Sequence, residues 1–288
     1  MRPRRSLTFG LCLVSVLLLA SPATTFGLKA KAPEREISLR PKSVALRSRS
    51  VRFPWDGQLL RGMALSESKF VRHLPENSAS GRFYGTWQLV QLLSRGARRV
   101  AARFPGAKLT IGELSSRAGG DIDGHRSHES GRDADVGFYM RRSDGSIYTG
   151  NQKFVEFDAA GRGLAPNGGL RFDATRNWEL VSKLVSDDDA RVQFIFVSRG
   201  LRQLLLQTAA KRKASAEIIE RAAAVMVEPT HGNPHRSHFH VRIYCPPTDR
   251  PVCRDVAPYY AWYPGTPPVV PVAAPPVPAP LGPLAIAQ

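Results

Sequence analysis

The chain has 288 residues, enough for one sizeable folded domain. Its 41 Lys and Arg residues against 24 Asp and Glu residues give a formal net charge of +17 at pH 7, and such an excess attracts polyanions and anionic surfaces. The arginines are dispersed along the chain, and no recognised nucleic-acid motif accompanies them. We therefore interpret the charge as a solvated basic surface and expect no nucleic-acid partner.

The first 27 residues have the three parts of a secretory signal peptide. A basic start, MRPRR, precedes an apolar run from Leu11 to Ala20 and small residues between Ala23 and Gly27. The run is shorter than the roughly 20 residues of a membrane-spanning helix, and no second apolar segment follows. We expect cleavage of residues 1–27, no membrane span in the mature form, and a periplasmic or secreted location. An uncleaved membrane anchor is the alternative.

Both ends of the remaining chain differ in composition from its middle. Residues 28–52 are basic and lack sustained periodicity, so we expect a flexible lead-in. Residues 264–288 are rich in Pro, Ala and Val, which predicts a polyproline-like, disordered tail without a core. The intervening residues 53–263 are then the single folded domain.

Helical periodicity of apolar residues marks four segments of this domain. They lie at about residues 89–104, 178–185, 201–210 and 216–227, the last with Ser215 as a candidate N-cap. Strands are expected at 108–114, 134–140, 191–198 and 237–244. Helices and strands interleave without regular βαβ repeats, so we predict an α+β domain with a mainly antiparallel central sheet flanked by helices.

The mature chain would retain two cysteines, because Cys12 lies inside the expected signal peptide. Cys245 and Cys253 form an isolated close pair, and such pairs form disulfides in the oxidising compartments that receive exported proteins. We therefore expect a disulfide between them. Metal binding is the alternative, but the Cys-x7-Cys spacing differs from that of a zinc knuckle.

Six of the seven histidines fall in two short stretches. The first is GHRSHESGRDAD, from Gly124 to Asp135, and the second is HGNPHRSHFH, from His231 to His240. Neutral imidazoles and carboxylates are common ligands of zinc, and a catalytic zinc takes three protein ligands and leaves a fourth position open. The paired stretches therefore predict a zinc site.

The second stretch runs into the predicted strand 237–244, on which side chains alternate between two faces. His238 and His240 share one face, so one could bind a metal while its neighbour transfers a proton. In the first stretch, a turn after His128 could bring it to Asp135, and His240 would complete a His, Asp, His set.

Four other residues of these stretches receive simpler interpretations. Glu129, Arg132 and Asp133 are expected either on the surface or beside the ligands. His231 is expected in a loop, next to the turn formed by residues 232–234.

Both stretches resemble the two motifs of the penicillin-insensitive murein endopeptidases, here residues 124–135 and 235–246. The resemblance extends more weakly over residues 58–255. This family belongs to the wider group of lysostaphin-type and D-Ala-D-Ala metallopeptidases, which share a fold with the hedgehog signalling domain. The resemblance therefore implies a hedgehog-like or DD-peptidase-like fold and cleavage of D-alanyl–diaminopimelyl cross-links in bacterial peptidoglycan.

The resemblance also implies roles for single residues. It makes His128, Asp135 and His240 the ligands of Zn²⁺. His238 becomes the general base, and His235 a second catalytic or substrate-contacting group. His125 would lie beside the ligands or bind a second metal, although the residues that would complete a second site have no counterpart in this sequence.

Three alternatives remain open. A zinc D-Ala-D-Ala carboxypeptidase or dipeptidase would use the same ligands, and a non-catalytic wall-binding module could retain the fold. A third class rests on Ser66 and Lys69, which fit the Ser-x-x-Lys pattern of penicillin-binding serine peptidases. No Lys-Thr-Gly or Ser-Asp-Asn partner of that pattern is found in the sequence.

Overall fold

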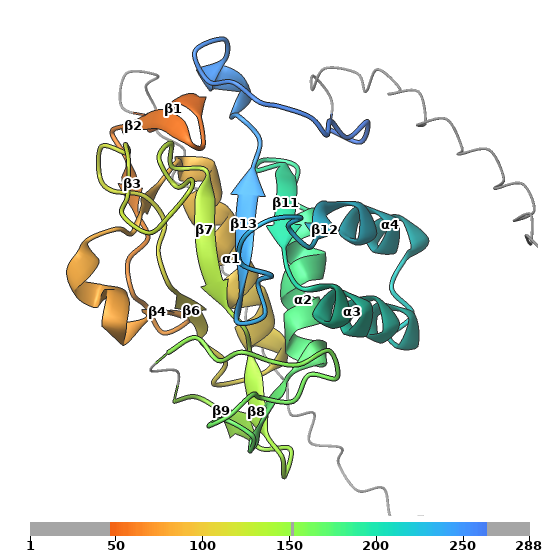
Figure 1. Cartoon of the computed structure of the whole chain (residues 1–288). Coiled ribbons are helices and arrows are strands. Elements are labelled where there is room, and N and C mark those ends of the chain that lie inside the picture. The colour runs from red at the N-terminus through yellow and green to blue at the C-terminus, as the bar shows by residue number, and fades with distance from the viewer. Residues whose placement is uncertain (1–46, 151–152, 264–288) are drawn as a thin grey trace, which may run out of the picture. The chain divides into compact units, whose positions relative to one another are not determined.

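The computed structural model describes residues 47–150 and 153–263. The expected signal peptide and the expected Pro-rich tail lie outside the described residues. A six-stranded sheet forms the centre of the described domain (Figure 1), with the strand order β12-β11-β13-β7-β6-β4. The six strands are β4 (Val71–His73), β6 (Leu109–Ile111), β7 (Asp133–Gly137), β11 (Val192–Phe196), β12 (Met226–Val227) and β13 (His238–Ile243).

The central strand pairs of this sheet are antiparallel, and the two edge pairs are parallel. Strands β6, β7, β13 and β11 run antiparallel to one another in that order, whereas β12 joins β11 and β4 joins β6 in parallel. The predicted α+β domain with a mainly antiparallel sheet is therefore confirmed. The edge strands escaped prediction because they have only two and three residues, too few to show a period.

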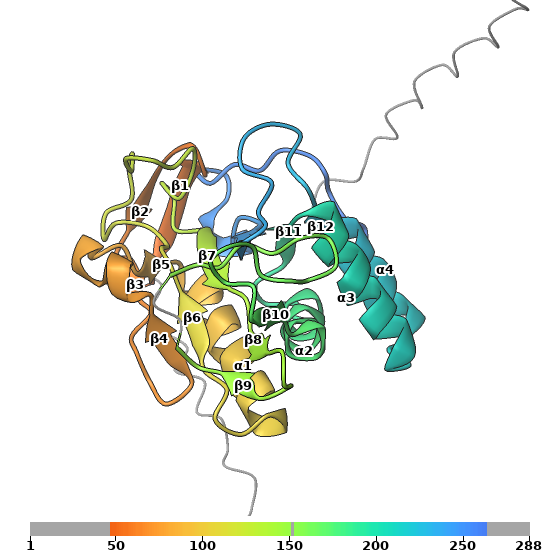
Figure 2. The same cartoon turned by 60° about the horizontal axis from the view of Figure 1, so that its bottom comes forward.

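Four α-helices accompany the sheet within the described residues, and each overlaps a predicted helix. In Figure 1, α1 (Trp87–Arg103) and α2 (Ala174–Val185) lie behind the sheet, and α3 (Arg199–Lys211) and α4 (Ala216–Val225) lie beyond its β12 edge. Figure 2 shows α3 and α4 side by side. The apolar faces of α1 and α2 are buried in the main core, through residues such as Leu89, Leu92, Leu93, Val100, Leu180 and Leu184. No helix of the described part is long and apolar enough to cross a membrane.

Local hydrogen bonds explain where these helices begin and end. Helix α2 begins at Ala174, before the predicted residue 178, because the Asp173 side chain caps its first turn. Ser215 caps α4 in the same way, as predicted. Helix α4 ends at Val225, since the next two residues pair with β11 as strand β12.

Short elements surround the central sheet. They are the hairpin β1 (Arg49–Phe53) and β2 (Asp56–Leu60), the pair β3 (Met63–Ala64) and β5 (Tyr84–Gly85), the small sheet β8 (Met140–Arg142), β9 (Ile147–Tyr148) and β10 (Leu170–Phe172), and the 3-10 helices at Pro75–Ser80 and Pro247–Asp249.

Strand β1 begins at Arg49, so the last residues of the expected lead-in, residues 28–52, belong to the folded domain. Ser50 is fully buried, and its backbone N–H donates to Asp249 Oδ2 at 2.8 Å. The strand was hidden in the sequence because its partners are β2 and the chain after β13. Neither partner leaves a local pattern within 28–52.

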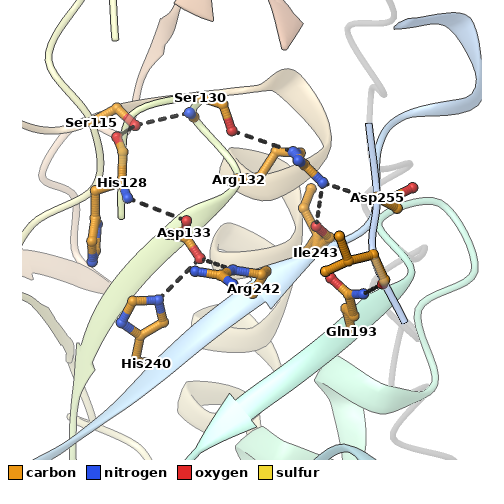
Figure 3. Close-up of polar contacts among 12 residues, drawn as sticks. Ser115, His128, Ser130, Arg132, Asp133, Gln193, His240, Arg242, Ile243 and Asp255 are labelled. Carbon is orange, nitrogen blue, oxygen red and sulfur yellow. Dashed lines mark hydrogen bonds and ion pairs between the residues drawn. The ribbon is translucent and has the colours of Figure 1, made fainter. Parts of the chain in front are cut away.

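A buried ion pair ties the start of β7 to the chain after β13. The Arg132 side chain has no exposed surface, and its Nη1 lies 2.7 Å from Oδ1 of the buried Asp255 carboxylate (Figure 3). The Cys245–Cys253 disulfide closes the same segment, so this prediction is confirmed. A surface position for Arg132 is thus wrong. Its partner is more than a hundred residues away in the chain, so the sequence around Arg132 does not reveal it.

We expect Arg132→Met to lower the free energy of unfolding by about 3 kcal/mol, because it removes a buried counter-charge of Asp255. Urea unfolding followed by circular dichroism measures this loss. Adding Asp255→Asn should recover part of it, since less uncompensated charge then remains buried. Arg162→Met removes an exposed ion pair with Asp158 and should lower the free energy of unfolding far less. Equal losses for Arg132→Met and this control would contradict the interpretation.

Candidate metal centre

The two histidine stretches meet because β7 and β13 are neighbours in the sheet. Their antiparallel register sets His240 opposite Asp135, and directly opposed side chains on one face of a sheet lie in contact. The loop before β7 brings His128 to the same place, with its ring centroid 4.7 Å from that of His240. All three residues are buried. The structure thus brings the predicted His128, Asp135 and His240 set together.

Oδ1 of Asp135 lies at the centre of this group. It is 3.5 Å from His128 Nε2, 3.3 Å from His240 Nδ1 and 3.6 Å from His238 Nε2. Ligand atoms held 2.0–2.1 Å from a tetrahedral zinc ion are about 3.4 Å apart. Each of the three nitrogens therefore lies at a distance from Oδ1 that suits two ligands of one metal ion.

Two atoms of the group have no hydrogen-bond partner among the described residues, namely His128 Nε2 and Asp135 Oδ1. Buried polar side-chain atoms nearly always find a partner. His128 Nδ1 donates to the Leu114 carbonyl at 2.7 Å, so Nε2 is the ring nitrogen that faces Asp135. A buried imidazole nitrogen and a buried carboxylate oxygen that face each other without a hydrogen bond suit a shared cation. A donor set of imidazole nitrogen and carboxylate oxygen fits zinc.

Asp133 lies beside these candidate ligands and is completely buried. Its Oδ1 accepts from His240 Nε2 at 3.0 Å and from Arg242 Nε at 2.6 Å, and its Oδ2 accepts from the His128 backbone N–H at 3.3 Å (Figure 3). Burial alone would raise the pKa of Asp133, but the Arg242 charge and the His240 hydrogen bond hold this pKa well below its ordinary value. Asp133 was expected either on the surface or beside the ligands, and the structure places it beside the candidate ligands.

The Asp133 contact decides which nitrogen of His240 faces the group. With Nε2 bonded to Asp133, Nδ1 is the atom directed at Asp135. Burial would lower the pKa of His240, but the hydrogen bond with Asp133 and the negative charges of Asp133 and Asp135 outweigh burial and raise the pKa to about 9. A metal ion bound at Nδ1 would replace a proton there, so metal binding would release it.

His125 and Glu113 form a second histidine–carboxylate pair. His125 Nε2 lies 2.7 Å from Glu113 Oε2, and its Nδ1 lies 3.8 Å from Asp135 Oδ2. Burial would raise the pKa of Glu113, but the hydrogen bond with His125 helps to lower it to about 2 and raises the pKa of His125. Ligand atoms of His125, His128 and Asp135 all lie within 4.8 Å of one another. His125 therefore competes with His240 for the third ligand position.

Glu113 is a site residue that the sequence analysis missed. It follows strand β6, and one carboxylate at the end of a predicted strand carries no signal of its own. Its contact with His125 depends on the pairing of β6 with β7, at Ile111 and Val136. A pattern confined to either motif cannot show this pairing.

His238 lies on the same face of β13 as His240 but has different contacts. Its ring stacks on Phe154 at 4.6 Å, and its Nδ1 lies 2.9 Å from Ser237 Oγ. Burial lowers the pKa of His238, which favours a neutral ring able to accept a proton. Phe154 was also missed, because a single aromatic residue outside both motifs does not differ from a core residue in sequence.

A cavity of about 460 Å³ opens onto these side chains, and all six histidines of the two stretches line it. His231 is exposed in its loop, as expected, and the exposed Arg126 lies on the wall. His235 Nδ1 donates to the Asn233 carbonyl at 2.7 Å. Burial and the charges of the neighbouring histidines lower the pKa of His235 to about 4. Its ring is therefore neutral, with Nε2 left as an acceptor.

The region that forms this site matches a known family. A family model described as penicillin-insensitive murein endopeptidase covers residues 76–262, which include both histidine stretches. The chain belongs to the penicillin-insensitive murein endopeptidase family. The resemblance of the two motifs is thereby confirmed.

Relatives with this name come from two bacterial species. A penicillin-insensitive murein endopeptidase of Haemophilus influenzae is 31% identical over 216 residues, which cover 68% of this chain and 68% of that protein. Proteins of the same name from two Klebsiella pneumoniae strains are 28% identical over 217 residues, which cover 68% of this chain and 72% of each relative.

The positions of Ser66 and Lys69 bear on the serine-peptidase alternative. Ser66 and Lys69 are exposed, and neither lies among the described residues that line the histidine cavity. Lys69 Nζ instead lies over the Phe70 ring at 4.9 Å. The geometry thus gives the Ser-x-x-Lys pattern no support.

Proposed function

We propose that this protein is a zinc-dependent murein endopeptidase that hydrolyses D-alanyl–diaminopimelyl cross-links in bacterial peptidoglycan. The observation that carries the proposal is the pair of buried ligand atoms without hydrogen-bond partners among the described residues, His128 Nε2 and Asp135 Oδ1, at 3.5 Å. The named relatives support the substrate class, since each is called a murein endopeptidase.

The proposed zinc ligands are His128, Asp135 and His240. We prefer His240 to His125 because its Nδ1 lies 3.3 Å from the unpaired Oδ1 of Asp135, whereas His125 Nδ1 lies 3.8 Å from the other oxygen. The His125 side chain is also more exposed, at 24% against 11%. A bound zinc ion would supply Lewis acidity, which lowers the pKa of water and polarises the scissile carbonyl.

His238 is the proposed general base. Its neutral ring would take the proton of the attacking water at Nε2 and later return one to the leaving amine. His235 has its own proton on Nδ1, so it would accept a substrate N–H at Nε2 instead of donating to an oxyanion. The exposed Arg126 on the cavity wall would supply positive charge for the developing oxyanion.

We also propose that the enzyme works in the periplasm or outside the cell. The Cys245–Cys253 disulfide supports an oxidising compartment, which would also hold the proposed substrate.

A carboxypeptidase or dipeptidase with the same ligands is the main alternative, and a non-catalytic wall-binding module is the other. Mass spectrometry of purified cross-linked muropeptides after digestion separates the three. An endopeptidase converts dimers to monomers without loss of terminal D-alanine. A carboxypeptidase or dipeptidase releases D-alanine, and a binding module leaves the dimers intact.

Inhibitors give a second test of the chemistry. Cross-link hydrolysis should continue in penicillin, stop in a strong chelator and return when zinc is added, because the proposed centre uses no serine nucleophile. Hydrolysis that penicillin blocks and chelation does not affect would refute the zinc proposal.

Single substitutions should separate the ligands from the base. His240→Ala removes a ligand, so zinc content and turnover should fall together. His238→Ala should keep about one zinc per chain while turnover falls roughly 100-fold or more. His125→Ala should also keep its zinc. Elemental analysis beside turnover decides the assignment, and loss of zinc from His125→Ala but not from His240→Ala would exchange their roles.

The Asp133 contact predicts a loss of metal affinity. Asp133→Asn should weaken zinc binding by about 10- to 100-fold, because it removes the carboxylate that orients His240. Competition with a chromophoric chelator measures the Kd. Glu113→Gln is the matched control, since it removes the carboxylate that orients His125 and should change the Kd far less. The reverse ranking would identify His125 as the third ligand.

A further inference from the structure

A second cavity, of about 270 Å³, lies past the C-terminal end of β7. Figure 1 shows the neighbouring strands β8 and β9 below the end of β7. Among the described residues, none lines both this cavity and the histidine cavity. Its wall includes Arg72, Lys108, Tyr139, Thr149 and Arg176.

This wall contains three cationic side chains and, within the described residues, no acidic one. Arg72 is half-buried in β4 and bonds only to uncharged partners: Nε donates to Thr110 Oγ1 at 2.9 Å, and Nη1 donates to the Thr149 carbonyl. No ion pair of Arg72 is found in the described part of the chain. Its charge is therefore partly removed from water without a carboxylate to balance it.

The second guanidinium, that of Arg176, is almost fully buried. Its Nε lies 2.9 Å from Asp173 Oδ2, so its charge is balanced within the protein. The exposed Lys108 adds a third positive charge at the cavity. The net charge of the groups around the cavity is thus positive.

The Tyr139 hydroxyl adds an unused donor. The residue lines the cavity and is 4% exposed, and its Oη is buried without a hydrogen-bond partner among the described residues. The Arg176 guanidinium lies 5.5 Å from the centre of its ring. Burial raises the pKa of Tyr139, so the hydroxyl keeps its proton. A buried O–H of this kind needs an acceptor.

We propose that this cavity binds a small oxyanion, a carboxylate or phosphate group, held by Arg72, Arg176 and Tyr139. An oxyanion supplies both features that the wall lacks, a negative charge and hydrogen-bond acceptors. A guanidinium also matches the paired oxygens of such groups. The site is separate from the histidine cavity, and the proposal does not depend on the peptidase function.

Thermal unfolding of the full chain tests this site. Melting temperatures are measured in inorganic phosphate, acetate and chloride at matched ionic strength, because a ligand of the native state raises the melting temperature with its concentration. Phosphate, acetate or both should raise it well above the value in chloride, and the more effective ion identifies the group. Equal effects of all three salts would overturn the proposal.

Two substitutions locate the binding. Arg72→Gln should weaken the apparent affinity for the effective ion roughly tenfold or more, and Tyr139→Phe should weaken it several-fold. Without that ion, Tyr139→Phe should melt at or above the wild-type temperature, since it removes an unsatisfied hydroxyl. Arg162→Gln, at an exposed ion pair, is the control for charge and should respond like wild type.

If Arg72→Gln and Tyr139→Phe both keep the wild-type response, the ion binds elsewhere and the proposal fails. If Arg72→Gln does not fold, Tyr139→Phe decides alone, since it removes a single oxygen atom. Turnover of muropeptides by Tyr139→Phe should equal that of wild type. A failed peptidase assay would therefore leave this result unaffected.

Discussion

The buried carboxylate of Asp133 is the contact on which the arrangement of the site depends. It accepts hydrogen bonds from His240 and Arg242 on β13 and from the backbone of His128 in the loop before β7. A carboxylate without solvent contact is tolerated only when its charge and its lone pairs are compensated. These donors come from both histidine stretches, so the same contact holds the stretches together and directs His240 Nδ1 toward Asp135. The register of β7 and β13 and the geometry of the candidate ligands are therefore coupled.

Asp133 and Asp135 show how one strand gives two carboxylates different roles. They lie two residues apart on β7, and the register with β13 sets Asp133 opposite Arg242 and Asp135 opposite His240. The guanidinium neutralises the first carboxylate inside the protein. The second faces imidazoles, and its Oδ1 has no hydrogen-bond partner among the described residues. The residues opposite them on β13 thus give the two carboxylates different roles. Asp133, opposite Arg242, is structural, and Asp135, opposite His240, is a candidate metal ligand.

The sequence predicted those features that depend on local periodicity. The alternation in residues 237–244 predicted β13 and placed His238 and His240 on one face, and the helical period predicted α1. The features that it could not predict depend on contacts between distant segments. Glu113 reaches His125 only because β6 lies beside β7, and β1 forms only against β2 and the chain after β13. The choice between His125 and His240 as the third ligand likewise depends on contacts between distant segments, because Glu113 orients His125 and Asp133 orients His240.

The basic composition also has a structural use, which corrects its interpretation as a solvated surface alone. Three arginines of the described part are buried, and each is matched by a carboxylate: Arg132 by Asp255, Arg176 by Asp173 and Arg242 by Asp133. Arginine stays charged when buried and offers several donors, so it can bind a carboxylate and backbone carbonyls together. Half-buried Arg72 has no such carboxylate within the described residues, and Tyr139, whose buried hydroxyl has no hydrogen-bond partner there, lines the same cavity. The same requirement for charge balance that accounts for the three buried ion pairs therefore favours an anion from outside the chain at Arg72.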